Sequence, residues 1–267
     1  MTMNLTGASG RRYGGSIMRR ILTALLVAAL GVIPLRPLSA TGQVVILDYH
    51  TFIGNGKSGL DYTLADLGAQ LDRMISLGYR IVSLDDAIAG KVEGRANIVI
   101  TIDDGNLSSY AACKEVFEVR GIRPELFIYP FIIGRNRHAL SPTQLKELAD
   151  DGCGVGAHGF YHEYMTAKAY AKDPWKVMIE VTRPAPALER LLNARPRLFA
   201  YPFGVGCPQV ERALRDAGYE WAFSASDKLS EVDFSDPVLD HYNVPRTIVY
   251  HWNRDKIFSY LAARLKD

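Results

Sequence analysis

The chain of 267 residues contains little cysteine, no internal repeat and no low-complexity linker. Its three cysteines, Cys113, Cys153 and Cys207, have no paired spacing, which excludes a zinc knuckle and a framework of several disulfides. They are either buried small hydrophobic residues or, in an oxidising compartment, the source of one disulfide. In the second case we expect Cys153 to pair with Cys207, because the two lie close in sequence to motifs that we expect to share one site.

An apolar run long enough to cross a bilayer is also missing. Segment 21–35 is shorter than the roughly 20 residues that a membrane span needs, and Arg36 follows it directly. Four arginines precede this segment, and the small residues of 38–40 offer a cleavage site, which is the pattern of a secretory signal. We therefore expect residues 1–40 to be a signal peptide and the protein to be exported, to the periplasm or the extracellular space. The alternative is a retained membrane anchor.

Basic clusters are absent from the rest of the chain. Residues 1–40 hold five arginines and no acidic residue, so residues 41–267 carry a formal charge of −3, although the whole chain carries +2. A slightly acidic chain without a Lys/Arg cluster lacks the electrostatic footprint of nucleic-acid binding. We expect no nucleic-acid partner, and contact with a membrane only through the amino-terminal segment if it is retained.

Short apolar runs alternate with helical patterns along residues 41–267, as in chains built from βα units. Strands are predicted at 44–49, 79–83, 98–102, 126–129, 154–157, 198–201, 221–224 and 247–250. Helices are predicted at 64–77, at 141–149 and at 210–217, where helical spacing or a Ser-Pro start is followed by a stop. This order favours an α/β fold in one domain of adequate size, either a parallel barrel or a doubly wound sheet.

What is present is a set of polar residues at predicted strand ends. Asp103 and Asp104 come directly after the β-branched run 98–102, so both lie at the carboxyl end of a buried strand, where barrel enzymes keep their reactive groups. His158 and His162 follow another strand with a spacing that could place both on one side of a helical turn. Asp104 and two histidines leave coordination sites open, as in catalytic zinc-type sites, and Asp103 stays free as a base. The sequence predicts a metal-dependent hydrolase.

These motifs resemble those of the polysaccharide deacetylases, carbohydrate esterase family 4. Residues 101–105 (Thr-Ile-Asp-Asp-Gly) are similar to the first motif of the family. Residues 158–162 (His-Gly-Phe-Tyr-His) are similar to the second, and residues 199–204 (Phe-Ala-Tyr-Pro-Phe-Gly) to the third. The resemblance covers essentially all of residues 41–267, and it implies that they form a single catalytic domain with a distorted (β/α)7 barrel.

The resemblance also implies roles for individual residues. Asp103 would be the general base, and Phe203 would contribute a backbone N–H to the oxyanion. Tyr201 is a further candidate for oxyanion or substrate contact, because an aromatic face suits the apolar face of a pyranose. The residues that would hold a divalent metal, most readily zinc and otherwise cobalt or nickel, are Asp104, His158 and His162.

The chain departs from the commonest form of the family at the third motif, where Ala200 stands in place of an arginine. The usual histidine after a late strand is also missing; instead His50 ends the first predicted strand. This resembles the permuted branch that contains the poly-N-acetylglucosamine deacetylases, which implies that His50 is the general acid. Arg246 matches another feature of that branch, and we expect it to contact Asp103 and keep it ionised.

The function implied by this resemblance is that of an exported, metal-dependent hydrolase that removes N-acetyl groups. Its polysaccharide substrate would contain N-acetylhexosamine, either as a poly-N-acetylglucosamine-like polymer or as an envelope polysaccharide. The altered third motif leaves open a relative that binds glycan without turnover, and the same chemistry would cleave O-acetyl esters or a non-glycan amide. An amidohydrolase fits less well, because its first strand usually carries His-x-His and this chain has only His50 there.

Overall fold

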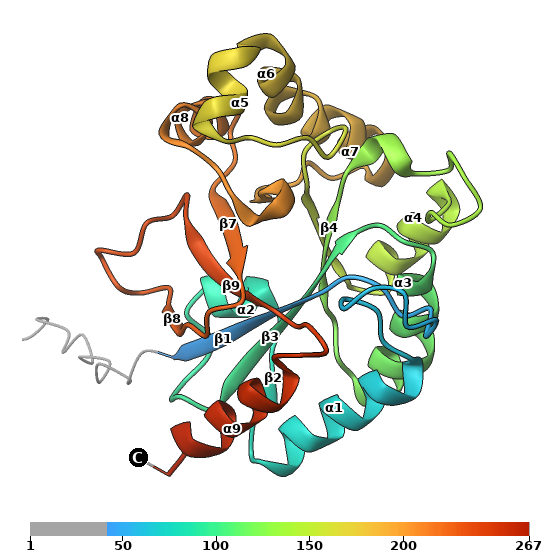
Figure 1. The fold of residues 1–267 in the computed structure, drawn as a ribbon, viewed down its shortest axis with the longest axis vertical. Helices are drawn as coiled ribbons and strands as arrows, with labels where there is room; N and C mark the ends of the chain where they lie inside the picture. The colour runs from blue at the N-terminus through green and yellow to red at the C-terminus, as the bar shows by residue number, and fades with distance from the viewer. Residues whose placement is uncertain (1–41, 267) are drawn as a thin grey trace, which may run out of the picture. The chain divides into compact units, whose positions relative to one another are not determined.

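Parallel strands close into a barrel at the centre of the fold (Figure 1). The computed structural model describes residues 42–266, and the pairing of the first strand with the third closes the ring of seven. In spatial order the barrel strands are β1 (Gln43–Tyr49), β3 (Asn97–Asp104), β4 (Glu125–Ile128), β5 (Gly154–Ala157), β6 (Leu198–Ala200), β7 (Trp221–Ser226) and β9 (Val244–Ile248). This confirms the distorted (β/α)7 barrel.

Two short strands extend the barrel wall. β2 (Arg80–Ile81) pairs in parallel with β3, and β8 (Val232–Asp233) pairs in the antiparallel direction with β1. The signal peptide expected over residues 1–40 lies outside the described residues. None of the helices within residues 42–266 has the length and hydropathy required to cross a membrane.

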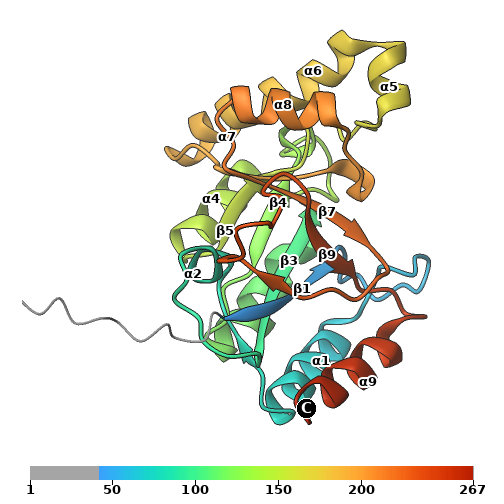
Figure 2. The ribbon, with the colours of Figure 1, turned by 90° about the vertical axis from the view of Figure 1, so that its left-hand side faces the viewer.

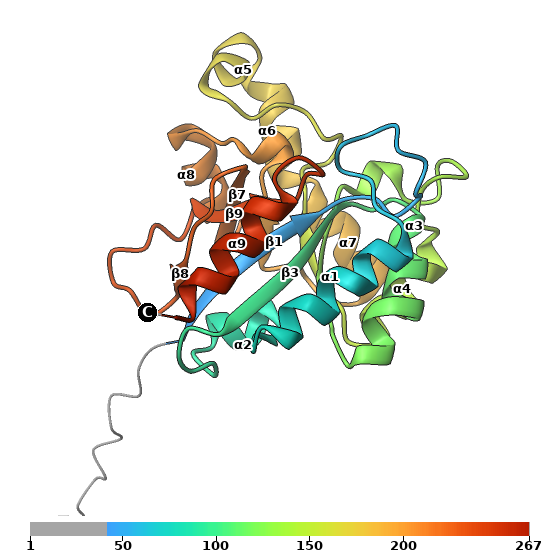
Figure 3. The same cartoon turned by 60° about the horizontal axis from the view of Figure 1, so that its bottom comes forward.

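Helices and short helical turns cover the outside of the barrel (Figures 1 and 2). The α-helices are α1 (Leu64–Ser76), α2 (Leu84–Ile88), α3 (Ser108–Ala111), α4 (Pro142–Asp150), α5 (Ala167–Lys172), α6 (Pro174–Thr182), α7 (Pro184–Leu192), α8 (Pro208–Asp216) and α9 (Arg254–Arg264). The shorter turns are the π-helical η1 (Ala112–Phe117) and the 3-10 segments η2 (Glu118–Arg120), η3 (Pro130–Ile132) and η4 (Pro202–Gly204). α1 and α9 lie side by side (Figures 2 and 3). The guanidinium of Arg73 on α1 lies over the ring of Phe258 on α9.

Side chains alternate between the two surfaces of the barrel wall. Val44 and Ile46 of β1 and Val99 of β3 belong to an apolar cluster that also holds residues of α2, whereas Val45 and Leu47 pack in the larger outer core. Because side chains alternate along a strand, every second residue of this first set continues a row that faces the inside of the barrel. At the carboxyl ends of the strands, the residues of this row are polar. In β1 that residue is Asp48; in β3 the row continues with Thr101 and Asp103, and in β9 it includes Arg246, all of them buried.

The predicted elements agree with the structure except at some boundaries. The strand predicted at 79–83 is only two residues long, because Ser83 accepts a hydrogen bond from the backbone of Asp86 and caps α2 instead. The strand predicted at 247–250 begins at Val244, since its charged residue Arg246 is satisfied inside the barrel. Ser141 caps α4 with a capping box and Pro142 in its first turn, as expected.

The expected pairing of Cys153 with Cys207 is wrong for this structure, in which all three cysteines are free. Cys153 precedes β5 at its amino end, whereas Cys207 follows β6 and η4 beyond their carboxyl ends, so the two lie toward opposite ends of the barrel. The thiol of Cys153 instead hydrogen-bonds that of Cys113, and both are buried.

Candidate active site

The two carboxylates of the first motif separate at the end of β3. Asp103 is the last inward-facing residue of the strand and is 2% exposed. Asp104 has a left-handed φ of 80°, and Gly105 follows with φ of 83°, so the chain turns sharply at the barrel mouth. The turn presents the Asp104 carboxylate at the rim, while Asp103 remains inside.

The two histidines of the second motif do not share a helical turn, which corrects the expected local structure. His158 follows β5 directly, and its backbone N–H continues the parallel ladder to Ile128 O at 2.9 Å. Its Nδ1 lies 2.9 Å from Ala200 O, which leaves Nε2 facing Asp103 and Asp104 at 3.5 and 3.6 Å. His162 lies in a loop with φ of 66° and brings its Nε2 to 3.3 Å from Asp104 Oδ1.

Glu180 of α6 fixes the loop that carries His162. Its carboxylate is fully buried and accepts hydrogen bonds from the backbone N–H groups of residues 160–163, at 2.9 to 3.3 Å. Burial raises the pKa of Glu180, and these backbone donors oppose that rise. Gly159 is required here, because its φ is 70° and an added Cβ would lie 2.5 Å from Glu180 Oε2. The backbone N–H groups of this segment therefore donate to a buried carboxylate, and the segment is a loop instead of the helical turn that the spacing suggested.

The donor set of Asp104, His158 and His162 fits a divalent cation. One ligand atom from each residue lies within 4.8 Å of the others. Asp104 Oδ1 is buried and has no hydrogen-bond partner among the described residues, which is costly unless a cation satisfies it. Two imidazole nitrogens and one carboxylate oxygen suit zinc, and also cobalt or nickel. The structure brings these three predicted ligands together.

Arg246 holds Asp103 from inside the barrel. Its Nη1 and Nη2 donate to the two oxygens of Asp103 at 2.7 and 2.8 Å, and Nη1 also donates to Thr101 Oγ1 at 2.9 Å. Burial raises the pKa of Asp103, but the positive charge of Arg246 and its hydrogen bonds outweigh this and hold the pKa well below the usual range. The expected contact between the two residues is present.

His50 and Asp48 form the other wall of the site. His50 follows β1, and its Nδ1 lies 3.9 Å from Asp48 Oδ1. Burial lowers the pKa of His50, but the carboxylates of Asp48, Asp103 and Asp104 outweigh it, so the pKa is raised. Burial also raises the pKa of Asp48 to about 7, against the positive charge of Arg246. Sequence reasoning missed Asp48, although a carboxylate inside an apolar strand, two residues before His50, was the available signal.

Asp48, His50 and Asp103 also lie close enough together to be considered as a second metal site. The guanidinium of Arg246 already contacts both carboxylates, at 3.4 Å for Asp48 and 2.7 Å for Asp103. A second cation would be repelled by this fixed positive charge. The group is therefore better explained as an acid-base cluster than as a metal centre.

The two third-motif candidates are placed differently. Phe203 has a left-handed φ of 59°, and its ring centroid lies 4.6 Å from that of His162, so this residue borders the site. Tyr201 is buried, its hydroxyl donates to Tyr242 O at 2.8 Å, and its backbone N–H donates to Phe223 O. The Tyr201 ring therefore belongs to the core and cannot stack on a sugar, which corrects the expected substrate contact.

Residues 90–222 match the family model for polysaccharide deacetylase. The chain belongs to the polysaccharide deacetylase family. It is similar to IcaB from Ammonifex degensii, with 25% identity and a TM-score of 0.70 over 82% of this chain and 97% of that one. The likeness is consistent with the permuted branch expected from the position of His50.

Two further relatives extend the comparison. A de-N-acetylase from Aggregatibacter actinomycetemcomitans shares the fold, with 14% identity and a TM-score of 0.67 over 81% of this chain and 99% of that one. YxkH of Bacillus subtilis (strain 168), named for the same family, is 23% identical over 182 residues. That match spans 67% of this chain and 63% of the relative.

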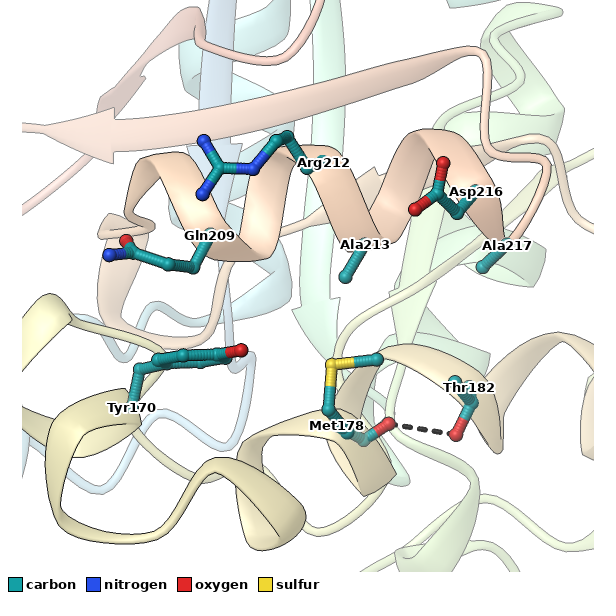
Figure 4. Close-up of a pocket in the computed structure, with 8 residues that line it drawn as sticks. All are labelled: Tyr170, Met178, Thr182, Gln209, Arg212, Ala213, Asp216 and Ala217. Atoms are coloured by element: carbon teal, nitrogen blue, oxygen red, sulfur yellow. Dashed lines mark hydrogen bonds between the residues drawn. The ribbon is translucent and has the colours of Figure 1, made fainter.

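A groove between α6 and α8 is separate from the candidate site (Figure 4). Tyr170 and Met178 line one side, and Gln209 and Ala213 of α8 line the other. Thr182 donates a hydrogen bond to Met178 O at 2.7 Å at its edge. None of the predicted site residues lines this groove, so it contributes no group to the chemistry of the barrel mouth.

Proposed function

We propose that this member of the polysaccharide deacetylase family is a metal-dependent hydrolase that removes N-acetyl groups from a glycan containing N-acetylhexosamine. The substrate is a poly-N-acetylglucosamine-like polymer or an envelope polysaccharide. The observation that carries the proposal is the meeting of two different groups at one barrel mouth. Asp104, His158 and His162 offer a cation site, and Asp103, paired with Arg246, lies 3.5 Å from His158.

The residues divide the reaction between them. Asp104, His158 and His162 would hold a divalent ion, which would supply Lewis acidity toward the acetyl carbonyl. Asp103, kept ionised by Arg246, accepts a proton from the attacking water.

His50, whose pKa is raised by its carboxylate neighbours, then donates a proton to the leaving amine. The backbone N–H of Phe203 stabilises the negative charge that develops on the acetyl oxygen.

The test is release of acetate from N-acetylglucosamine oligomers by protein that is stripped of metal and then reloaded with zinc, cobalt or nickel. We expect release that depends on the metal and that Asp103→Asn abolishes. Asp216→Asn, on the exposed face of α8, is the matched control and should retain wild-type release. Stoichiometric metal binding measured on the same samples separates loss of chemistry from loss of the ion.

Three results would contradict the proposal in different ways. Tight oligomer binding without acetate release under any metal favours a relative that binds glycan without turnover. Release of acetate from O-acetylated sugars or small amides, with none from N-acetylated oligomers, shows the same chemistry directed at another acyl substrate. Release that persists in Asp103→Asn removes the assignment of the base.

We also propose that the protein is exported and acts in the periplasm or outside the cell. The support is the charged, apolar and small-residue pattern of residues 1–40. Amino-terminal sequencing of the protein recovered from cell fractions should give a chain that begins at Thr41, outside the cytoplasmic fraction. Full-length protein in the membrane fraction would mean that the segment is retained as an anchor, and full-length protein in the cytoplasm would overturn export.

A further inference from the structure

The segment that follows β9 lies beside the predicted acid. β1 and β9 are parallel and pair Asp48 with Ile248, and the ladder continues through a hydrogen bond from Val249 N–H to Asp48 O at 2.9 Å. Two residues beyond this pair, His50 follows the end of β1 and Tyr250 follows the end of β9, so both lie past the carboxyl ends of these neighbouring strands. Burial raises the pKa of Tyr250, and the negative charge of Asp48 adds to this rise, which agrees with a position of Tyr250 near Asp48.

Tyr250 and Trp252 form a stacked aromatic pair at this position, and this pair is called the β9 platform below. Their ring centroids are 5.2 Å apart and their planes differ by 18°. Trp252 is 65% exposed, so most of its surface faces solvent. Most of the Trp252 ring is therefore not used in packing, and its face is available to contact a ligand.

The β9 platform is held rigidly by its own backbone and by a neighbouring loop. Asn253 is buried; its side chain accepts from Tyr250 N–H and donates to Ile248 O, both at 2.8 Å. His251 N–H donates to Gly59 O at 2.9 Å, which ties the segment to the loop after His50. A fixed aromatic surface loses little conformational entropy when a ligand binds.

A second exposed aromatic pair lies on the metal-ligand side of the site. The rings of Tyr164 and Phe203 stack with centroids 3.9 Å apart and an interplanar angle of 17°, and the Phe203 ring borders that of His162. Aromatic surfaces therefore lie on both sides of the predicted reaction centre, one beside His162 and one beside His50. This arrangement suits an extended ligand with flat apolar faces that crosses the barrel mouth.

We propose that the β9 platform, Tyr250 and Trp252, binds one sugar ring of the glycan next to the unit that is deacetylated. The inference rests on the proposed function, because the leaving amine stays attached to the glycan and must lie near the acid His50. The neighbouring sugar on that side then meets the platform. Pyranose C–H faces pack on aromatic faces without requiring charge, in keeping with a neutral N-acetylated polymer.

The test compares N-acetylglucosamine dimers and hexamers as ligands of the zinc-loaded full chain in an Asp103→Asn background, where turnover is suppressed. Trp252→Ala should raise the Kd for the hexamer about two- to tenfold, the range expected for loss of one aromatic contact. The Kd for the dimer should change less. Trp252→Phe should recover most of the hexamer affinity. Trp175→Ala removes a tryptophan that is even more exposed, at 75%, on α6, and should leave both dissociation constants unchanged.

The outcomes separate the platform from the proposed function. Wild-type acetate release together with an unchanged hexamer Kd in Trp252→Ala overturns the platform alone. Weaker hexamer binding in Trp252→Ala supports the platform. If the protein that retains Asp103 also releases no acetate, the same result overturns the proposed function. Absence of hexamer binding overturns the platform. So does loss of binding to phosphatidylglycerol vesicles in Trp252→Ala with unchanged hexamer binding, which would identify a membrane contact.

Discussion

Arg246 and Asp103 face each other inside the barrel through two parallel hydrogen bonds of 2.7 and 2.8 Å. Arg246 has no exposed surface, and Thr101 and the ring of Phe127 surround its guanidinium. A bidentate pair of this kind fixes the orientation of the carboxylate as well as its charge. β9 therefore supplies the bidentate arginine contact to Asp103 that the sequence led us to expect.

Replacing Arg246 with lysine should lower kcat/KM about 100-fold or more at neutral pH, because an ammonium group cannot reproduce the two parallel hydrogen bonds. Arg246→Met should lower kcat/KM further than the lysine variant does. The pKa of Asp103 is lowered by Arg246, so removing the guanidinium raises it, and the base is inactive when protonated. The acidic limb of the kcat/KM profile should therefore move to higher pH. An unchanged pH profile in both variants contradicts the assignment of Arg246.

Stability must be measured beside activity, because Arg246→Met leaves the buried carboxylates of Asp48 and Asp103 without their counterion. Breaking a buried ion pair costs on the order of 3–5 kcal/mol in the free energy of unfolding. Adding Asp48→Asn removes one of the two buried carboxyl groups and should recover part of this stability without recovering activity. Arg197→Met, at an exposed ion pair with Asp85, is the control for loss of a surface arginine.

His50 should matter more for an amide than for an activated ester, because only a poor leaving group needs its proton. His50→Ala should lower kcat on N-acetylglucosamine oligomers by about 100-fold or more, and affect p-nitrophenyl acetate hydrolysis far less. Asp48 is one of the carboxylates that raise the pKa of His50. Asp48→Asn should lower that pKa, and the acid is inactive when deprotonated, so the basic limb of kcat should move to lower pH. Equal losses on both substrates in His50→Ala would show that His50 is not the acid.

Much of the fold and of the site could be predicted because local patterns carry the information. The β-branched run before Asp103 and Asp104 predicts a buried strand, and parallel strands place their ends at the same mouth. The contact between Arg246 and Asp103 joins residues more than 140 positions apart, and only the family resemblance pointed to it. The pairing of β1 with β3, which closes the barrel, is invisible in any local window.

The details that failed depend on contacts distant in the sequence. The spacing of His158 and His162 favours a helical turn, but Glu180 supplies an acceptor for the intervening N–H groups and stabilises a loop. In the sequence Tyr201 is a candidate for stacking on a sugar, but in the structure its hydroxyl donates to the backbone oxygen of Tyr242 in the core. For Glu180 a signal existed, because it shares the buried face of α6 with Val177 and Val181.

Glu125 should make the stability of the fold depend on pH at the amino end of β4, far along the strand from the site. Burial raises its pKa to about 8 from an ordinary value of 4.5, so the folded state holds a proton that the unfolded state has released. The contribution of Glu125 to stability is fully present below its pKa in the unfolded state. It is lost as the pH rises through its pKa in the folded state. The free energy of unfolding should fall by about 1 kcal/mol per pH unit between them from this group alone.

Glu125→Gln should remove that pH dependence and leave a protein that is more stable than the wild type at pH 8. Urea unfolding at several pH values measures this dependence, with Glu115→Gln as the control at an exposed carboxylate of η1. A slope that remains unchanged in Glu125→Gln would mean that another group binds the proton.

Glu180 should control metal affinity without touching the metal site. In Glu180→Gln an amide NH₂ replaces an oxygen that accepts backbone N–H groups, so donors face donors and the loop of His162 loses its anchor. We expect the Kd for zinc to rise about 10- to 100-fold, the usual cost of losing support behind a ligand.

Competition with a chromophoric chelator measures this affinity, and amide hydrogen exchange of residues 160–163 should be faster in the metal-free variant. Glu163→Gln, in the same loop but with a partly exposed side chain paired with Lys176, is the matched control and should retain wild-type affinity. If Glu180→Gln is less stable yet binds zinc as tightly as the wild type, Glu180 supports the fold and does not position His162.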